Sequence, residues 1–162
     1  MVQFNLPQNS KIEVGKYYKD ITRSKNLKKI NVYRWDPSNG KNPRVDTFEV
    51  DMDSCGPKVL DILFRIKKEI DSSLTVRRSC AHGVCGSCAM NIDGVNTLAC
   101  IKSHTDINGD LNVYPLPHRK VIKDLIGDLT TLYKQYESIK PWLETVQTGE
   151  EKTELNQSQK DR

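Results

Sequence analysis

The sequence predicts an α+β fold, in which a small mixed sheet carries one helix across a face and a second, amphipathic helix lies outside that unit. Three observations support this prediction. Several short runs alternate between apolar and polar residues, as half-buried strands do. Two stretches repeat apolar residues at spacings of three and four, as helices do. Four of the five cysteines fall between positions 80 and 100.

The first part of the chain predicts a hairpin. Residues 1–26 are polar and mixed, and we expect an extended arm or surface segment there. An alternating run at 30–35 predicts the first strand, and a second run at 47–51 predicts its hairpin partner. The residues between them at 36–40 are rich in turn formers, which supports this pairing.

A helix and further strands follow. Apolar residues repeat at helical spacing from Val59 to Ile70, and Pro57 suits the first turn of such a helix. Short strands are expected at 74–78, 89–93, 96–101 and 111–116. Asp93-Gly94 is a strong signal for a tight turn between two of these strands. The order of elements over residues 27–117 fits a β-grasp, ferredoxin-like domain.

After residue 117 the pattern changes to a long helical stripe. We predict one amphipathic helix within 118–145 from the spacing of Val121, Ile122, Leu125, Ile126, Leu129, Leu132, Tyr133, Tyr136 and Ile139. The sheet needs one helix for cover, so this second helix needs another surface and is expected to dock on a partner. Residues 146–162 are almost all polar and predict a linker or a disordered tail.

The composition argues against several classes of protein. The net charge is +4, but no run of basic residues is interleaved with aromatic residues, so nucleic-acid binding is not expected. No apolar run approaches the ~20 residues that cross a bilayer. The N-terminus has neither the apolar core of a secretory signal nor the composition of a transit peptide. The odd number and close clustering of the cysteines argue against a disulfide framework.

The clustered cysteines follow the spacing C-x4-C-x2-C…C, which fits the plant-type ligand set of a [2Fe–2S] cluster. They are Cys80, Cys85, Cys88 and Cys100. Each iron of such a cluster takes two protein ligands besides the bridging sulfides, and thiolates are soft, charged donors that suit it. We therefore expect a [2Fe–2S] cluster in the loop 79–88, with the fourth ligand returned by the following hairpin.

Further residues of this loop are expected to surround the sulfurs. Gly83 and Gly86 permit backbone conformations that most residues avoid, so that loop N–H groups can point at sulfur. Four more neighbours are candidates for contact with the cluster, namely Arg78, Ser79, His82 and Ser87. Positive charge close to the cluster, such as that of Arg78, should favour the reduced form and raise the reduction potential.

A zinc site or a Rieske centre fits the cysteines less well. Structural zinc sites prefer two C-x2-C pairs, and one is present here. Cys80-Ala-His82 resembles half of a Rieske centre, but no second histidine completes it. Cys55 stands apart before the helix, where a lone cysteine is most often a small buried apolar residue.

Taken together, the motifs resemble the iron–sulfur subunits of succinate dehydrogenase, respiratory complex II. The resemblance runs from about residue 28 to 145. It is carried by Tyr33-Arg-Trp-Asp-Pro37, Cys55-Gly-Pro-Lys-Val-Leu-Asp61, Arg77-Arg-Ser-Cys80, Cys85-Gly-Ser-Cys88-Ala-Met-Asn, Asn96-Thr-Leu-Ala-Cys100, Tyr114-Pro-Leu-Pro-His118 and Val121-Ile-Lys-Asp-Leu125. This chain has Ala81-His82 where the family usually has Arg-Glu, which changes the charge beside the cluster and leaves the ligands untouched.

The resemblance implies an oxidoreductase subunit that relays electrons and carries no catalytic residues of its own. The implied partners are an FAD-containing flavoprotein that oxidises succinate, a C-terminal iron–sulfur half with [4Fe–4S] and [3Fe–4S] clusters, and membrane-anchor subunits, with ubiquinone as the acceptor. The implied location is the matrix side of the mitochondrial inner membrane, as a peripheral subunit. No cysteine follows Cys100, so we expect the C-terminal half on a separate polypeptide, with this chain either a natural half or a fragment.

Three alternative functions compete with this one. The small iron–sulfur subunit of molybdenum hydroxylases has a similar first motif, but it requires a second cysteine motif that is absent here. A free ferredoxin shuttle is commonly acidic, places its fourth cysteine much farther away and has no use for the helical extension. A cluster-free accessory subunit would hold zinc in the cysteines and bind a partner through the helix.

Overall fold

The computed structural model describes residues 11–19 and 24–142. The expectations for the first ten residues and for the tail 146–162 lie outside this range. The chain divides into two compact units, Met1–Leu129 and Thr130–Arg162.

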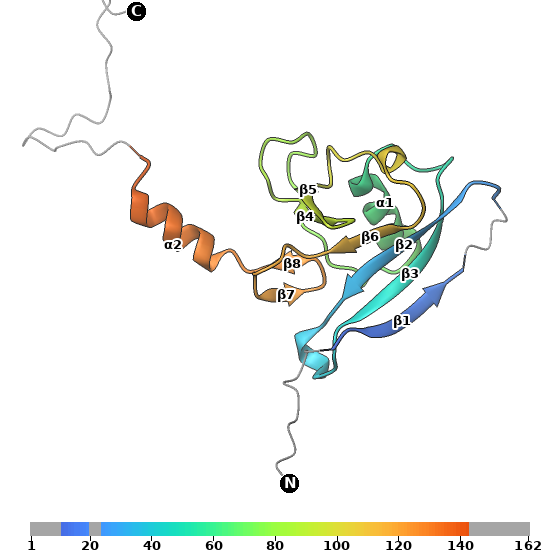
Figure 1. Ribbon diagram of the computed structural model, residues 1–162, viewed down its shortest axis with the longest axis horizontal. Coiled ribbons are helices and arrows are strands. Elements are labelled where there is room, and N and C mark those ends of the chain that lie inside the picture. Colours follow the sequence, from blue (N-terminus) through green and yellow to red (C-terminus); the bar gives the residue numbers. More distant parts are fainter. Residues whose placement is uncertain (1–10, 20–23, 143–162) are drawn as a thin grey trace, which may run out of the picture. The chain divides into compact units, whose positions relative to one another are not determined.

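The first unit is built on a six-stranded mixed sheet with strand order β1-β3-β2-β6-β4-β5 (Figure 1). Its strands are β1 Glu13–Tyr18, β2 Leu27–Arg34, β3 Arg44–Asp51, β4 Ala89–Ile92, β5 Val95–Leu98 and β6 Leu111–Tyr114. β2 and β3 form an antiparallel hairpin, and β6 lies parallel to β2. Strands from the two ends of the domain therefore meet in the centre of the sheet, and the predicted α+β, β-grasp arrangement is confirmed.

The turn between β2 and β3 forms as its composition predicts. The side chain of Asp36 accepts a hydrogen bond from the Ser38 N–H at 2.9 Å and caps the short 3₁₀ helix Pro37–Asn39. Gly40 ends that helix with φ +61°, a left-handed conformation that glycine adopts without steric cost.

One helix covers the sheet. α1 Val59–Arg65 continues into a π-helical turn at Ile66–Ile70, so the predicted helix is confirmed with its last turn widened. Pro57 lies just before the Lys58 N-cap, outside the first turn where the sequence pattern had suggested it. The apolar side of the helix joins strand residues in one core, with fully buried side chains that include Ile30, Val32, Phe48, Ile62, Leu63, Ile66, Met90 and Val113. Each such side chain contributes about 1.5–3 kcal/mol to folding by leaving water.

β1 shows that the prediction of an arm over residues 1–26 is wrong for positions 13–18. β1 pairs in parallel with β3 at the edge of the sheet. The Tyr18 ring stacks on Phe48 with centroids 4.6 Å apart, and the Lys16 N–H donates to Asp46 Oδ1 at 2.7 Å. Asp46, which accepts this hydrogen bond, is fully buried. Hydrophobic patterning does not predict a buried aspartate.

Gly15 allows β1 to approach β3 closely, and its replacement by alanine should destabilise the chain. An added Cβ would lie 2.1 Å from Asp46 Oδ1 and 2.7 Å from the Val45 carbonyl oxygen. We expect Gly15→Ala to lower the free energy of unfolding by about 1–3 kcal/mol, as overpacking does. Gly127→Ala is the control, because its Cβ would meet Arg119 at an ordinary 3.4 Å. Urea titrations of both variants would measure the difference, and equal midpoints would contradict this account.

The segment 74–78 is extended but forms no strand, which corrects the prediction made for it. Its backbone pairs with side chains and with loop backbone, for example the Leu125 N–H, which donates to the Thr75 carbonyl at 3.4 Å. Lys67 Nζ donates to the Leu74 carbonyl at 2.7 Å, and the Thr75 N–H donates to Asp124 Oδ2 at 2.8 Å.

The predicted long helix from residue 121 is also wrong in its first part. A small hairpin, β7 Val121–Lys123 and β8 Ile126–Gly127, occupies that stretch, and α2 begins later, at Thr130–Ile139. The reason is the turn between β7 and β8. Asp124 adopts φ +46° and is 1% exposed, and its carboxylate accepts hydrogen bonds from the backbone N–H groups of Trp35 and Thr75. Leu125 beside it is buried in the core.

Arg34 joins these segments through a buried ionic network. Its Nε lies 3.0 Å from Asp124 Oδ1, and its Nη1 lies 2.7 Å from Asp71 and 3.5 Å from Asp46. The arginine side chain is 4% exposed, so these charges interact with little screening by water. Among the described residues, every buried side-chain nitrogen or oxygen has a hydrogen-bond partner. The network holds β2, β3, the segment after α1 and the β7–β8 hairpin together.

In the second unit, α2 confirms the later part of the predicted amphipathic helix. None of its residues is buried. Its apolar side and the residues after it are exposed, namely Leu132, Tyr133, Tyr136, Ile139 and Trp142. An isolated helix of this length is marginal in water, so α2 needs a surface to pack against. No helix in the described part of the chain is long and apolar enough to cross a membrane.

Candidate metal centre

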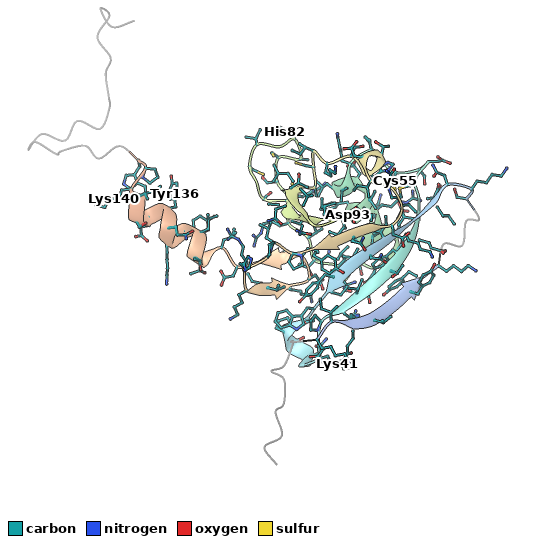
Figure 2. All side chains as sticks on the ribbon, in the orientation of Figure 1. Lys41, Cys55, His82, Asp93, Tyr136 and Lys140 are labelled. Carbon is teal, nitrogen blue, oxygen red and sulfur yellow. The ribbon has the colours of Figure 1, made fainter. Side chains whose placement is uncertain are left out.

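The cysteine loop projects from the domain between the end of the segment 74–78 and the start of β4. Figure 2 shows His82 at the outer end of this loop, with Cys55 on another part of the domain. Of the four loop and hairpin cysteines, Cys85 is exposed and Cys80 is half-buried, whereas Cys88 and Cys100 are buried. The sulfur-bearing residues therefore run from the surface into the domain.

Cys100 is returned to the loop by the predicted tight turn. Asp93 and Gly94 adopt φ values of +47° and +81°, as a two-residue β-hairpin requires, and β4 pairs with β5. The N-terminus of α1 then holds the chain around Cys100. The Leu60 N–H donates to the Ala99 carbonyl at 2.9 Å, and the Val59 N–H donates to the Lys102 carbonyl at 3.0 Å.

Backbone hydrogen bonds connect the cysteine segments. The Cys85 N–H donates to Cys80 Sγ at 3.3 Å, and the N–H of Ala99, the residue before Cys100, donates to the Cys88 carbonyl at 3.1 Å. The fold thus brings Cys85 to Cys80 and the chain at Cys100 to Cys88. A [2Fe–2S] cluster takes two protein ligands on each iron.

Backbone N–H groups point at the sulfurs, as the loop glycines had led us to expect. The Gly83 N–H donates to Cys100 Sγ at 3.1 Å, and the Val84 N–H donates to Cys80 Sγ at 3.4 Å. Gly83 and Gly86 have φ values of +84° and +71°, which supply the necessary backbone turn. These donors stabilise negative charge on sulfur and hence a bound thiolate cluster.

Ser87 contacts the exposed thiol. Its hydroxyl lies 3.1 Å from Cys85 Sγ, and this hydrogen bond is the main cause that lowers the pKa of Cys85 to about 6. Burial instead raises the pKa of Cys88. Because thiolates and not thiols bind metals, the contact with Ser87 favours the metal-binding form of Cys85.

The remaining residues proposed around the sulfurs lie at different places. The His82 ring nitrogen Nδ1 contacts the Cys80 carbonyl within the loop, and Ser79 is exposed beside the first cysteine. Arg78 does not pair with a carboxylate among the described residues, and its guanidinium lies over the Phe64 ring at 4.1 Å. Ala81 has φ +62°, an unusual conformation for alanine, at the position where this chain departs from the family pattern.

Cys55 is not brought to the four clustered cysteines. It is half-buried beside α1, where Arg65 Nη1 donates to its sulfur at 3.4 Å and burial is the main cause that raises its pKa. That Cys55 is not a ligand stays a prediction.

Two apolar residues beside the thiols were missed in the sequence. Val84 is 77% exposed and Ile101 is 51% exposed. Each is adjacent in sequence to one of the four cysteines, and an added Cβ at Gly83 would lie 2.9 Å from Ile101 Cγ2. An apolar residue within an otherwise small and polar loop was the signal that could have identified them.

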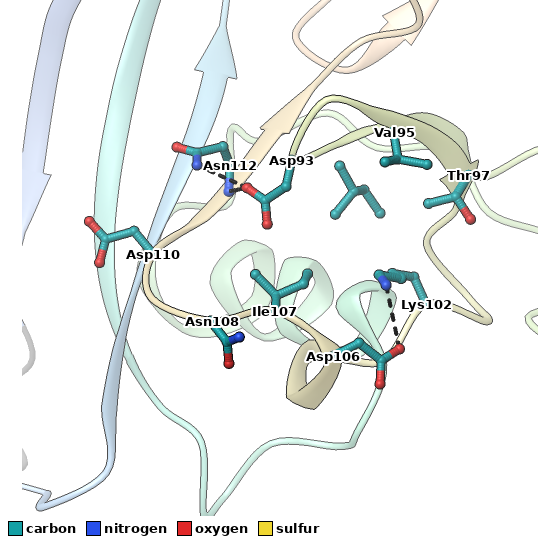
Figure 3. A pocket seen from close by; sticks show the side chains of 10 residues that line it. Asp93, Val95, Thr97, Lys102, Asp106, Ile107, Asn108, Asp110 and Asn112 are labelled. Carbon is teal, nitrogen blue, oxygen red and sulfur yellow. Dashed lines mark hydrogen bonds and ion pairs between the residues drawn. The ribbon is translucent and has the colours of Figure 1, made fainter.

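A separate open cleft of about 510 Å³ lies beside the β4–β5 hairpin (Figure 3). Asp93 on this cleft accepts hydrogen bonds from the Asn112 backbone and side chain at 2.9 Å, and Lys102 pairs with Asp106 at 3.4 Å. None of the four clustered cysteines lines it.

Comparison with known proteins bears on this site. Residues 29–134 match the family model for the 2Fe-2S iron-sulfur cluster binding domain. Over all 162 residues the chain is 55% identical to the succinate dehydrogenase iron-sulfur subunit of Paracoccus denitrificans, of which it covers 62%. A solved chain of the Mycobacterium smegmatis Sdh1 complex in the apo form is 28% identical, with a TM-score of 0.61 over 85% of this chain and 56% of that one. The chain thus spans about three fifths of its relatives, and the resemblance seen in the motifs is confirmed.

Proposed function

Because this chain belongs to the family of 2Fe-2S iron-sulfur cluster binding domains, we propose that it is an electron-transfer subunit of succinate dehydrogenase. Its cofactor is a [2Fe–2S] cluster, and the proposed ligands are Cys80, Cys85, Cys88 and Cys100. The observation that supports these ligands best is the set of loop N–H groups that donate to the sulfurs of Cys80 and Cys100. The alternative functions of a molybdenum hydroxylase subunit and a free shuttle find no support in these relatives.

A bound [2Fe–2S] cluster takes up and gives back one electron at a time. The protein would hold the cluster and set its reduction potential. The four cysteine thiolates would bind the irons, and the N–H groups of Gly83, Val84 and Cys85, which donate to the Cys80 and Cys100 sulfurs, would stabilise negative charge there. Because reduction adds negative charge, these donors favour the reduced state and raise the potential.

In this proposal the chain receives electrons from an FAD-containing flavoprotein and passes them toward [4Fe–4S] and [3Fe–4S] clusters of a C-terminal iron–sulfur half, and thence to ubiquinone. Membrane-anchor subunits would hold the assembly on the matrix side of the mitochondrial inner membrane. The apolar side of α2 is exposed, which supports the proposal that another protein packs against this helix. We assign this surface to the C-terminal half.

The flavoprotein is proposed to dock over the exposed end of the cysteine site. Electron transfer needs a short path, and Cys85 is the ligand that reaches the surface. Val84 and Ile101 give this end an exposed apolar character, which suits the centre of a protein interface. Polar and charged loop residues such as His82 would lie at its rim.

Val84→Lys tests this docking against Val95→Lys as a matched control. Both valines are exposed, by 77% and 62%, but Val95 lies on β5 and not in the cysteine loop. With cluster-loaded chain and reduced flavoprotein, Val84→Lys should weaken association by at least about tenfold, equivalent to about 1.4 kcal/mol. Val95→Lys should change it little. Titration calorimetry and stopped-flow reduction measure binding and transfer. Equal effects of both variants would rule out the docking face, and a loaded wild-type chain that binds no flavoprotein would contradict the proposed function.

Ser87→Ala should lower the reduction potential of the cluster. The variant removes the hydroxyl that contacts Cys85 Sγ and leaves all four proposed ligands in place. A hydrogen bond contributes about 0.5–1.5 kcal/mol, which corresponds to about 20–65 mV for one electron. A redox titration followed by EPR measures the shift, and Ser87→Thr, which keeps a hydroxyl, should retain most of the potential. An unchanged potential in Ser87→Ala would show that the contact is lost once the cluster binds.

A further inference from the structure

The chain contains two Asn-Gly sequences, Asn39-Gly40 and Asn108-Gly109. In such a sequence the backbone nitrogen of the glycine can attack the side-chain amide of the asparagine, because glycine has no Cβ to hinder the approach. The amide carbon must first reach the glycine nitrogen, so the reaction depends on how freely the asparagine rotates. The two sites share this chemistry, and the fold holds them differently.

Hydrogen bonds hold Asn39 in the turn between β2 and β3. Asn39 is the last residue of the 3₁₀ helix that Asp36 caps, and its backbone N–H donates to the Asp36 carbonyl at 3.4 Å. Its side-chain Oδ1 accepts a hydrogen bond from the Lys41 N–H at 3.0 Å. Backbone and side chain are thus both restrained, and the amide can turn onto the Gly40 nitrogen only after these hydrogen bonds open.

Asn108 has no such restraint. It lies between the 3₁₀ helix His104–Asp106 and β6, and it is exposed. Within residues 11–19 and 24–142 neither its amide nor the Gly109 N–H has a hydrogen-bond partner. Figure 3 shows the Asn108 amide at the cleft beside the β4–β5 hairpin, with no interaction drawn to it. The side chain can therefore rotate onto the Gly109 nitrogen without breaking a hydrogen bond.

We propose that Asn108 is a site of spontaneous modification, at which the asparagine converts to aspartate and isoaspartate. The Gly109 nitrogen loses its proton and bonds to Cγ of Asn108, and the amide nitrogen leaves as ammonia. Water then opens the cyclic imide at either carbonyl. One opening gives aspartate, and the other gives isoaspartate, with the side-chain carbon in the backbone. Either product adds a carboxylate to a cleft already lined by Asp93, Asp106 and Asp110.

The test is incubation of the purified full-length chain at mildly alkaline pH, followed by peptide mapping with mass spectrometry. Asn108 should convert at least about tenfold faster than Asn39, because both hydrogen bonds of Asn39 must open first. Fragmentation of the product peptides should show aspartate and isoaspartate at position 108. In urea, where the fold no longer restrains Asn39, the two sites should convert at similar rates.

Two variants provide matched controls. Asn108→Gln should remove the modification at 108 and leave the rate at Asn39 unchanged, because the longer side chain closes the corresponding ring far more slowly. Asp36→Ala removes the carboxylate that accepts the Ser38 N–H at 2.9 Å, so it should speed conversion of Asn39 and not of Asn108.

Equal rates at the two sites of the folded wild-type chain would overturn this inference, and so would faster conversion of Asn39. Conversion of Asn108 in urea but not in the folded chain would also overturn it. These measurements are made on the peptides and are independent of the cluster, so the proposed function stands or falls separately.

Discussion

Replacing Cys88 with alanine should abolish assembly of the [2Fe–2S] cluster. Cys88 is 3% exposed, so a proposed ligand would be lost in a place that water and outside ligands reach poorly. The remaining free thiol, Cys55, lies beside α1 with Arg65 and is not positioned to replace it. Clusters of this kind are held by four protein ligands, and three leave one iron open.

Cys55→Ala provides the matched control for this loss. It removes a half-buried thiol from the same domain and should leave iron content unchanged. Chains purified without air are analysed for iron and acid-labile sulfide, and the reduced protein is examined by EPR. Two irons and two sulfides per chain are expected for wild type and Cys55→Ala, and close to none for Cys88→Ala. A full cluster in Cys88→Ala, or its loss in Cys55→Ala, would refute the proposed ligand set.

Replacing Arg34 with methionine should lower the free energy of unfolding by about 3–5 kcal/mol, the usual cost of removing one partner from a buried ionic network. Asp124 would remain buried without the guanidinium that pairs with it, and Asp71 would lose its ion pair at 2.7 Å. The β7–β8 hairpin would lose its main link to β2, so the chain near Asp124 should also become more sensitive to protease. Urea unfolding and limited proteolysis measure the two effects.

Lys102→Met is the control for the Arg34 variant. Lys102 and Asp106 form an ion pair with 31% and 54% side-chain exposure, so its loss should cost about 0–1 kcal/mol. An Arg34→Met variant as stable as Lys102→Met would show that the buried charges are neutralised in another way.

The Arg34 network also predicts how stability depends on pH. Burial acts to raise the pKa of Asp71, but hydrogen bonds from Ser73 and Arg34 outweigh it and hold that pKa well below its usual range. A carboxyl whose pKa is lower in the folded state stabilises the fold fully above its unfolded value of about 3.9 and loses this effect as pH falls below it. Wild-type stability should therefore fall below about pH 4, and the fall should be smaller in Arg34→Met.

Features set by neighbouring residues were predicted well from the sequence. The cysteine spacing indicated the cofactor, which the family match confirms. Asp93-Gly94 predicted its hairpin and the 3–4 periodicity predicted α1, because turn conformation and helical amphipathicity depend on residues close in the chain. The ligand roles of the four cysteines stay a prediction that the alanine variants will test.

Features set by distant contacts were missed. β1 looked like a polar arm because its attraction to β3 runs through Gly15 and the buried Asp46. Residues 121–129 have helical periodicity, yet Arg34 and two distant backbone N–H groups hold Asp124 in a turn. Hydrophobic patterning treats aspartate as exposed, so it cannot detect a carboxylate that is buried with its partners.

Local chemistry in the chain was sufficient for the cofactor, the family and the β2–β3 and β4–β5 hairpins, because spacing, turn type and periodicity act over a few residues. The exposure of Cys85 with Cys88 and Cys100 buried, and the placement of Arg78 on Phe64, required the folded molecule. Both depend on contacts between α1 and segments far from it in sequence. The packing of the whole core decides which of these contacts form.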